Sequence, residues 1–292
     1  MSQKLHIFTV ASDQNHHLDR LQCSAEKFGI KLDVLGLGQP YLGNGQKITF
    51  ILDYLRALPV DDLFLFVDAY DVIFLTGQDE ILTCYNTDYQ GDLVFGAERN
   101  FGMYSWDDLY QYLRYPVKGS FYRFLNSGTI MGPVQKAIDL YSGFTMKPTD
   151  KMDQLRTIRY FIKHPETLVL DTTHTLFGVT GGRVGLEEDD YRIENGRLYA
   201  VQTDSWPCIF HVPGKFFPIL DSISYRLGVM DRLPLYTRQE LTWLAAQSTD
   251  NRRCAKLGWD PYVFRLVKQW IMNLIYIAAL VGLVKGALNL FY

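Results

Sequence analysis

This chain of 292 residues has few cysteines and a small net charge. The four cysteines, Cys23, Cys84, Cys208 and Cys254, form no CxxC pair and no dense framework, which argues against a disulfide scaffold or a zinc site. A formal net charge of −3 gives no basic field of the kind that binds nucleic acid. We therefore expect no nucleic-acid partner.

Targeting and phosphate-binding motifs are missing as well. The first residues, "MSQKLHIFTVAS", enter a strand without the charged segment and long apolar run of a signal peptide, so we expect a cytoplasmic location. The P-loop pattern GxxxxGK[ST] is absent, and no GxGxxG follows the first strand. These absences argue against a P-loop enzyme and a dinucleotide-binding enzyme.

Apolar runs of strand length alternate with helical stretches, which predicts an α/β fold with a doubly wound sheet. The expected strands are Leu5–Ala11, Lys31–Leu37, Leu63–Val67, Leu93–Ala97, Leu125–Met131, Leu168–Leu170 and Cys208–His211, and the expected helices are Asp13–Phe28 and Ile48–Leu58. After the main domain (1–220) we expect a helical linker (221–260) and an apolar C-terminal tail (261–292).

Two carboxylates interrupt the apolar segment "LFLFVDAYDVIFL" at 63–75. Asp68 and Asp71 are three residues apart, at the carboxyl end of the strand that is expected to be the most buried. An unpaired charge beside a core is costly, so something should neutralise them. Two such carboxylates can converge on one Mg²⁺ or Mn²⁺ ion, often together with substrate phosphates. The plainer alternative is a pair of turn or capping aspartates that face solvent.

Two further clusters could serve such a site. In "CIFHVPGK", His211 ends an apolar strand and could ligate a metal, and Lys215 could meet a phosphate. In "GNGQK" at 43–47, two glycines let the backbone approach a ligand closely, and Lys47 could supply a positive charge.

Seven pieces of the chain, in order, resemble the glycosyltransferase domain of procollagen lysyl hydroxylases and the related collagen-type glucosyltransferases. They are "FTVAS" at 8–12, "GQK" at 45–47, "FVDAYDVIF" at 66–74, "FLNSGTIMG" at 124–132, "DQL" at 153–155, "IENGR" at 193–197 and "HVPGK" at 211–215. The resemblance covers roughly residues 4–218. It implies a GT-A fold, in which helices flank a Rossmann-like mixed sheet, with a UDP-sugar donor and Mn²⁺ or Mg²⁺ as cofactor.

The resemblance also implies roles for individual residues. Asp68, Asp71 and His211 would hold the metal. The UDP-sugar would be bound by Thr9, Lys47, Tyr70, Gly214 and Lys215. The catalytic residues, which would line the sugar and the acceptor, would be Asn126, Asp153 and Gln154. Each assignment has a plainer alternative: a helix-start lysine for Lys47, a turn residue for Asn126, a helix N-terminal acid for Asp153 and core packing for Tyr70.

The chain also departs from the family pattern. Only Asp153 remains of the family's run of acids before "QL", the family's His-Gly-Asn-Gly turn is "HVPG" here, and Tyr41 replaces a tryptophan. Metal and UDP binding therefore carry over, whereas the choice of sugar and acceptor does not. We expect transfer of a hexose to a hydroxyl of a glycan, protein or lipid, with retention as in the glucosyltransferase relatives. The alternatives are a metal-dependent phosphohydrolase or nucleotidyltransferase and a non-catalytic protein that binds sugar nucleotides.

The apolar tail predicts attachment to a membrane. Trp270–Val284 reads "WIMNLIYIAALVGLV", and the basic residues Arg252, Arg253, Lys256, Arg265 and Lys268 precede it. Basic flanks of this kind stay on the cytoplasmic side, so the catalytic domain would face the cytosol. In the alternative, the helix is buried against the domain or in a homodimer, and the protein is soluble.

Overall fold

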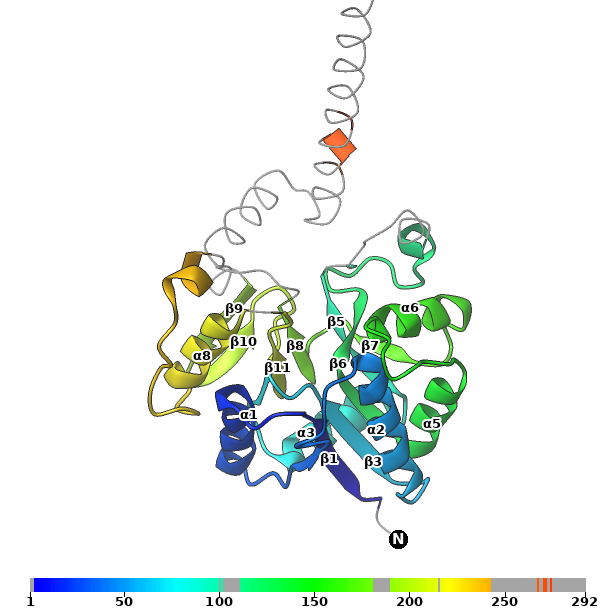
Figure 1. Cartoon of the computed structure of the whole chain (residues 1–292), viewed down its shortest axis with the longest axis horizontal. Coiled ribbons are helices and arrows are strands. Elements are labelled where there is room, and N and C mark those ends of the chain that lie inside the picture. Colours follow the sequence, from blue (N-terminus) through cyan, green and yellow to red (C-terminus); the bar gives the residue numbers. More distant parts are fainter. Residues whose placement is uncertain are drawn as a thin grey trace, which may run out of the picture.

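The computed structural model describes residues 3–99, 101, 111–180, 190–214, 216–242, 267, 270, 271 and 274, and it has a mixed α/β fold (Figure 1). The helices are α1 (His16–Lys27), α2 (Asn44–Arg56), α3 (Gln78–Asp88), α5 (Val134–Ser142), α6 (Asp153–Lys163) and α8 (Phe217–Arg226). The strands are β1 (Leu5–Val10), β2 (Asp33–Leu35), β3 (Leu63–Val67), β4 (Val72–Phe74), β5 (Val94–Glu98), β6 (Phe124–Pro133), β7 (Val169–Asp171), β8 (Phe177–Val179), β9 (Tyr191–Glu194), β10 (Arg197–Ala200) and β11 (Ile209–His211).

A six-stranded sheet in the order β2-β1-β3-β6-β5-β7 forms the centre of the domain. Strand β1 pairs in parallel with β2 and β3, whereas β6 runs antiparallel to both β3 and β5. The expected α/β class with a mixed sheet is confirmed. All five residues of β3 are buried, as its continuous apolar run predicts.

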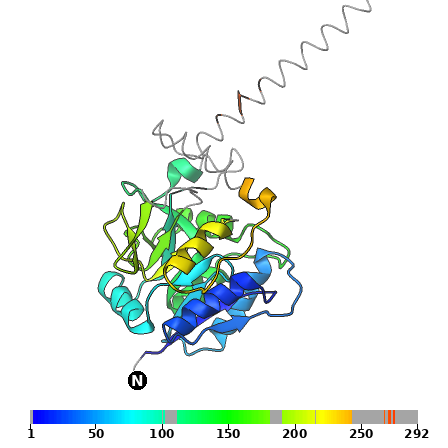
Figure 2. The ribbon, with the colours of Figure 1, turned by 90° about the vertical axis from the view of Figure 1, so that its left-hand side faces the viewer.

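The two faces of this sheet are covered by different helices (Figures 1 and 2). Phe64 and Phe66 of β3 belong to one core cluster with apolar residues of α2, α5 and α6. Leu63, Leu65 and Val67 belong to a second cluster with residues of α1 and α3. Because successive side chains of a strand point to opposite faces, β3 supplies both cores at once. Asp68 therefore follows directly after a strand that is held in place by packing on both of its faces.

A second, three-stranded sheet in the order β4-β11-β8 continues from the first. Only residues 68–71 separate the end of β3 from the start of β4. In this sheet β4 pairs antiparallel with β11, with Val72 opposite His211. The chain therefore passes from one sheet to the other through the segment that carries both aspartates.

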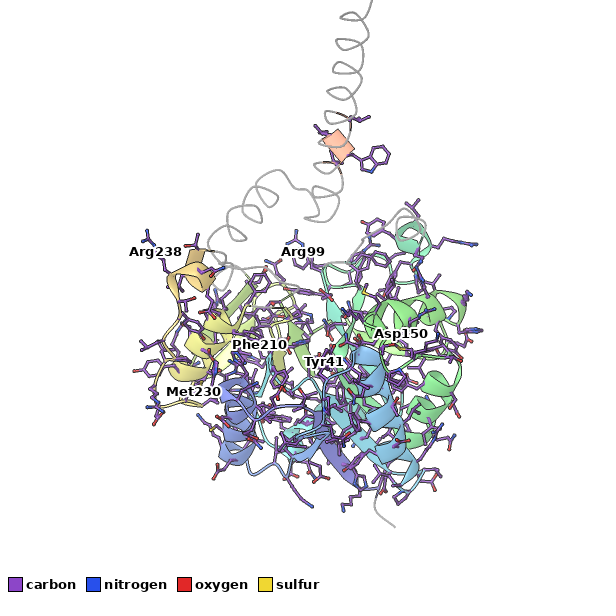
Figure 3. The ribbon with its side chains drawn as sticks, viewed as in Figure 1. Tyr41, Arg99, Asp150, Phe210, Met230 and Arg238 are labelled. Carbon is purple, nitrogen blue, oxygen red and sulfur yellow. The ribbon has the colours of Figure 1, made fainter. Side chains whose placement is uncertain are left out.

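Helix α2 begins at Asn44, four residues before the expected start at Ile48. No side chain caps it; instead, Gly45 N–H donates to Asp150 C=O at 2.8 Å and Gln46 N–H donates to Pro148 C=O at 3.1 Å. Gly43 and Gly45 were expected to let a ligand approach the backbone closely, but residues 147–150 pack against them instead. A Cβ on Gly45 would lie 1.9 Å from the Lys147 carbonyl oxygen, and a Cβ on Gly43 would lie 2.8 Å from the carbonyl carbon of Thr149. Figure 3 shows Asp150 near this end of α2.

Helix α8 runs across the expected boundary at residue 220. Ile219, Leu220 and Ile223 are buried in a third cluster with residues of β4, β10 and β11, and Figures 1 and 2 both show α8 beside α1. Arg20 of α1 donates to Asp221 of α8 in a fully buried ion pair. The domain therefore extends at least to the end of α8.

The second part of the linker (243–260) and nearly all of the tail lie outside the described residues, including Arg252, Arg253, Lys256, Arg265, Lys268 and most of Trp270–Val284. In the part of the chain that the structure describes, no helix is both long and apolar enough to cross a bilayer. The membrane attachment and the cytosolic orientation remain predictions.

We expect Gly45→Ala to lower the free energy of unfolding by about 1–3 kcal/mol, because the new methyl group overlaps the carbonyl of Lys147. Urea unfolding followed by circular dichroism measures this change. Gly77→Ala, at the start of α3, is the matched control: its Cβ would meet only Phe28 C=O, at 3.4 Å. Equal stability of the two variants would contradict the role assigned to Gly45.

Candidate metal and donor site

The link between the two sheets places Asp68 and Asp71 side by side. Asp68 N–H donates to the carbonyl of Gly128 on β6 at 2.7 Å, which ties the first aspartate to the central sheet. The carbonyl of Asp71 accepts from Val212 N–H at 2.9 Å, which ties the second to the end of β11. Backbone pairing on both sides thus fixes the two carboxylates, and both line one cavity.

His211 joins them from β11. Its side chain is 2% exposed, and Nε2 lies 3.3 Å from Oδ1 of Asp71. Among the described residues, Nδ1 has no hydrogen-bond partner, and Nε2 has the carboxylate of Asp71 as its polar neighbour. Burial lowers the pKa of His211, but the carboxylates of Asp71 and Asp68 outweigh it, and the pKa lies above its usual value. One ligand atom from each of the three residues lies within 4.8 Å of the others.

Gly128 makes room for this cluster. A Cβ at Gly128 would lie 2.3 Å from Cε1 of His211 and 2.6 Å from Oδ2 of Asp68. Two carboxylates and a buried imidazole suit a divalent cation, because Mn²⁺ and Mg²⁺ favour oxygen ligands and imidazole also binds transition metals. The residues therefore fit a metal centre, and the structure brings together all three predicted ligands.

Lys47 lies between the metal cluster and Asp153. Its Nζ is 3.2 Å from Oδ1 of Asp68 and 2.7 Å from Oδ2 of Asp153. Asp153 is the first residue of α6, yet it is buried and accepts from Asn44 Nδ2 at 2.8 Å and Ser127 Oγ at 3.2 Å. Burial raises the pKa of Asp153, but the contacts with Lys47 outweigh this and leave the pKa below its usual value. Asp153 is thus held as a carboxylate.

Asn126 and Gln154 converge on an acid that the sequence analysis missed, Glu98. Asn126 Nδ2 donates to Oε1 of Glu98 at 3.1 Å, and Gln154 Nε2 donates to the same oxygen at 3.0 Å. Burial raises the pKa of Glu98 to about 7, although both amide contacts lower it. Glu98 ends β5 opposite Phe124 of β6, two residues along that strand from Asn126, but no sequence spacing marks it. Its position after an apolar strand is the only feature that could have drawn attention to it.

A cavity of about 420 Å³ adjoins the metal cluster. It is lined by the end of β1 and the loop after it (10–13), by residues 36, 39 and 41, by the start of α2 including Lys47, and by residues 68–71 and 217. Figure 3 labels Tyr41 at this cavity, next to the start of α2. Tyr70 also lines it, and the Tyr70 hydroxyl accepts from Asp13 N–H at 3.1 Å. The volume and the wall suit a nucleotide or similar ligand.

Two other predicted donor-binding residues, Thr9 and Gly214, are not among the residues that line this cavity. Thr9 is fully buried, and its hydroxyl donates to Val67 C=O at 2.7 Å, so it fastens β1 to β3 while the cavity wall begins at Val10. Gly214 has φ +91 in the turn after β11, a backbone conformation that favours glycine. Lys215 lies outside the described residues.

Comparison with known proteins identifies the family. The profile of the PLOD GT domain, a glycosyltransferase domain, matches residues 1–227. The chain belongs to the PLOD GT domain family. The match ends one residue after α8, in agreement with the packing of that helix on the domain.

The PLOD GT domain relatives are larger proteins. The chain is 36% identical over 140 residues to the multifunctional procollagen lysine hydroxylase and glycosyltransferase of Caenorhabditis elegans, which covers 44% of this chain and 19% of the relative. It is 29% identical over 232 residues to procollagen-lysine,2-oxoglutarate 5-dioxygenase 1 of Gallus gallus, which covers 73% of this chain and 30% of the relative. The chain thus spans less than a third of either relative.

Solved structures with a similar arrangement include two glycosyltransferases. One is involved in glycosylating the major capsid of PBCV-1 and matches with a TM-score of 0.42 at 12% identity, over 77% of this chain and 99% of that one. The other is mouse xyloside xylosyltransferase 1, with a TM-score of 0.42 at 14% identity, over 72% of this chain and 98% of that one.

The pKa of Glu98 gives this PLOD GT domain a testable pH dependence. A buried acid whose pKa is raised from 4.5 to about 7 contributes stability below pH 4.5 that is lost as the pH rises to about 7. Between these limits we expect the free energy of unfolding of the wild type to fall, relative to Glu98→Gln, by up to about 3 kcal/mol. Urea titrations at pH 4.5, 6 and 7.5 measure the difference, and two parallel pH profiles would contradict burial of a neutral Glu98.

Proposed function

We propose that this chain transfers a hexose from a UDP-sugar to an acceptor hydroxyl, with Mn²⁺ or Mg²⁺ held by Asp68, Asp71 and His211. The observation that carries the proposal is the cluster of these three residues beside a nucleotide-sized cavity that Asp68 and Asp71 line, with a buried histidine between the core and the carboxylate of Asp71. The PLOD GT domain family supports a transferase rather than a hydrolase.

In this proposal the cavity binds the nucleotide and the metal cluster binds its diphosphate. Tyr70 lines the wall, where its ring offers a face on which a base can stack. Lys47 reaches the same cavity, and Lys215 follows the turn at Gly214, so both are candidates for contact with the phosphates. The bound cation would offset the charge that develops on the departing diphosphate.

The sugar and the acceptor would lie on the side of Asp153. Its carboxylate is fixed by Asn44, Ser127 and Lys47, and Gln154 follows it on α6. A carboxylate held ionised and oriented in this way can contact a sugar hydroxyl or accept a proton from the acceptor. Asn126 and Gln154, through Glu98, would keep this wall of the site in place. We further propose retention at the anomeric carbon, by the resemblance to collagen-type glucosyltransferases.

A donor screen tests the proposal. UDP-glucose, UDP-galactose, UDP-glucuronate and UDP-GlcNAc are each incubated with and without Mn²⁺, and release of UDP is measured together with transfer of labelled sugar. We expect one donor to release UDP only in the presence of the cation. Release of inorganic phosphate, or transfer of the nucleotide without the sugar, would support the phosphohydrolase or nucleotidyltransferase alternative instead.

Removal of a single ligand should abolish the cation-dependent reaction. We expect Asp71→Asn and His211→Gln each to lower kcat/KM at least 100-fold, because each replaces a carboxylate or imidazole ligand of the cation with a neutral, more weakly binding amide. Asp53→Asn, which changes an exposed aspartate of α2, is the matched control and should keep wild-type turnover. Wild-type turnover in Asp71→Asn, with the fold verified by circular dichroism, would refute the metal assignment.

A further inference from the structure

Lys47 is held by two carboxylates that belong to different parts of the site. Asp68, at 3.2 Å, is a metal-ligand candidate, whereas Asp153, at 2.7 Å, lies at the start of α6. The lysine side chain is 14% exposed, and its ammonium lies 5.6 Å from the ring centroid of Phe66. Lys47 is therefore packed in one place and cannot simply swing into solvent.

This arrangement places one positive charge among three carboxylates. The carboxylates of Asp68, Asp71 and Asp153 converge there, and unpaired carboxylates out of water are unstable. The ammonium of Lys47 lies between Asp68 and Asp153 and so supplies a positive charge next to the metal cluster.

A cation at Asp68 would compete with this ammonium. Oxygen ligands lie about 2.1 Å from Mg²⁺, so an ion held on Oδ1 of Asp68 would lie no more than about 5.3 Å from the ammonium of Lys47. Two positive charges at this distance, with limited access of water, repel each other. A diphosphate changes the balance, because Lys47 and Asp68 line the same cavity and a phosphate oxygen can replace Asp68 as partner of the lysine.

We propose that Lys47 is a stand-in cation for the metal: it occupies Asp68 when no metal is bound, and exchanges Asp68 for a donor phosphate when metal and nucleotide bind together. Asp153 stays its partner throughout, because Asn44 and Ser127 fix that carboxylate. This inference rests on the proposed function.

The exchange makes Lys47 a coupling residue. It opposes binding of the free cation and favours binding of the cation with a nucleoside diphosphate. Because such coupling is reciprocal, the cation should strengthen UDP binding by the same factor by which UDP strengthens cation binding. The site would thereby load metal and donor together.

A purely structural Lys47 makes the opposite prediction. If the lysine only fastens α2 to α6, its removal loosens Asp68 and weakens the metal site. If it is a stand-in cation, its removal frees Asp68 and strengthens binding of the cation alone. The sign of the change separates the two roles.

The experiment measures Mn²⁺ binding by electron paramagnetic resonance of free Mn²⁺, with and without UDP. We expect Lys47→Met to bind Mn²⁺ alone about tenfold more tightly than the wild type, and the strengthening by UDP to shrink at least tenfold. Lys47→Arg keeps the charge and is the matched control. Lys47→Met leaves Asp153 unpaired, so the double variant Lys47→Met/Asp153→Asn, which removes that buried charge as well, should show the same tighter binding.

Two results would overturn the inference, and they are distinguishable. If the wild type binds Mn²⁺ in a manner lost in Asp68→Asn, but Lys47→Met and the double variant both bind it equally or more weakly than the wild type, Lys47 is a structural residue. If the wild type shows no Asp68-dependent binding of Mn²⁺ with or without UDP, the metal centre of the proposed function fails together with the inference.

Discussion

The passage of one short segment between two sheets is the constraint on which the site depends. Strand β3 is buried on both faces, and β4 must reach its partner β11 within residues 68–71. The backbone of Asp68 is bonded to Gly128 and that of Asp71 to Val212. Neither aspartate can move without breaking sheet pairing, so the position of the carboxylates is set by the core and not by a flexible loop.

Charge balance explains the groups around that segment. Lys47 lies between Asp68 and Asp153, and His211 lies against Asp71, so each carboxylate of the site has a cationic or protonatable neighbour. Glu98 has two amide donors instead, and burial holds its pKa near 7. The acids on the two sides of the site are therefore stabilised in different ways: one group by positive charge, the other by neutral hydrogen-bond donors.

The sequence predicted the parts of this arrangement that depend on local pattern. The apolar run of β3 located Asp68 at a strand end, and the short run before His211 located the end of β11. The early start of α2 escaped prediction because its amides are bonded to residues 147–150, about a hundred residues away. The reason for a glycine at position 128 lies in its contact with His211 and Asp68 across the sheets, which no local pattern records. Glu98 was missed because its partners come from β6 and α6.

The central claim is that Asp68, Asp71 and His211 bind one divalent cation. Anomalous diffraction at the manganese edge, from crystals grown with Mn²⁺ and UDP, tests it most directly. The account predicts a single strong peak between the three side chains, with the diphosphate in contact with the ion. A peak elsewhere, or an ordered UDP in the cavity with no anomalous peak beside these residues, would contradict it.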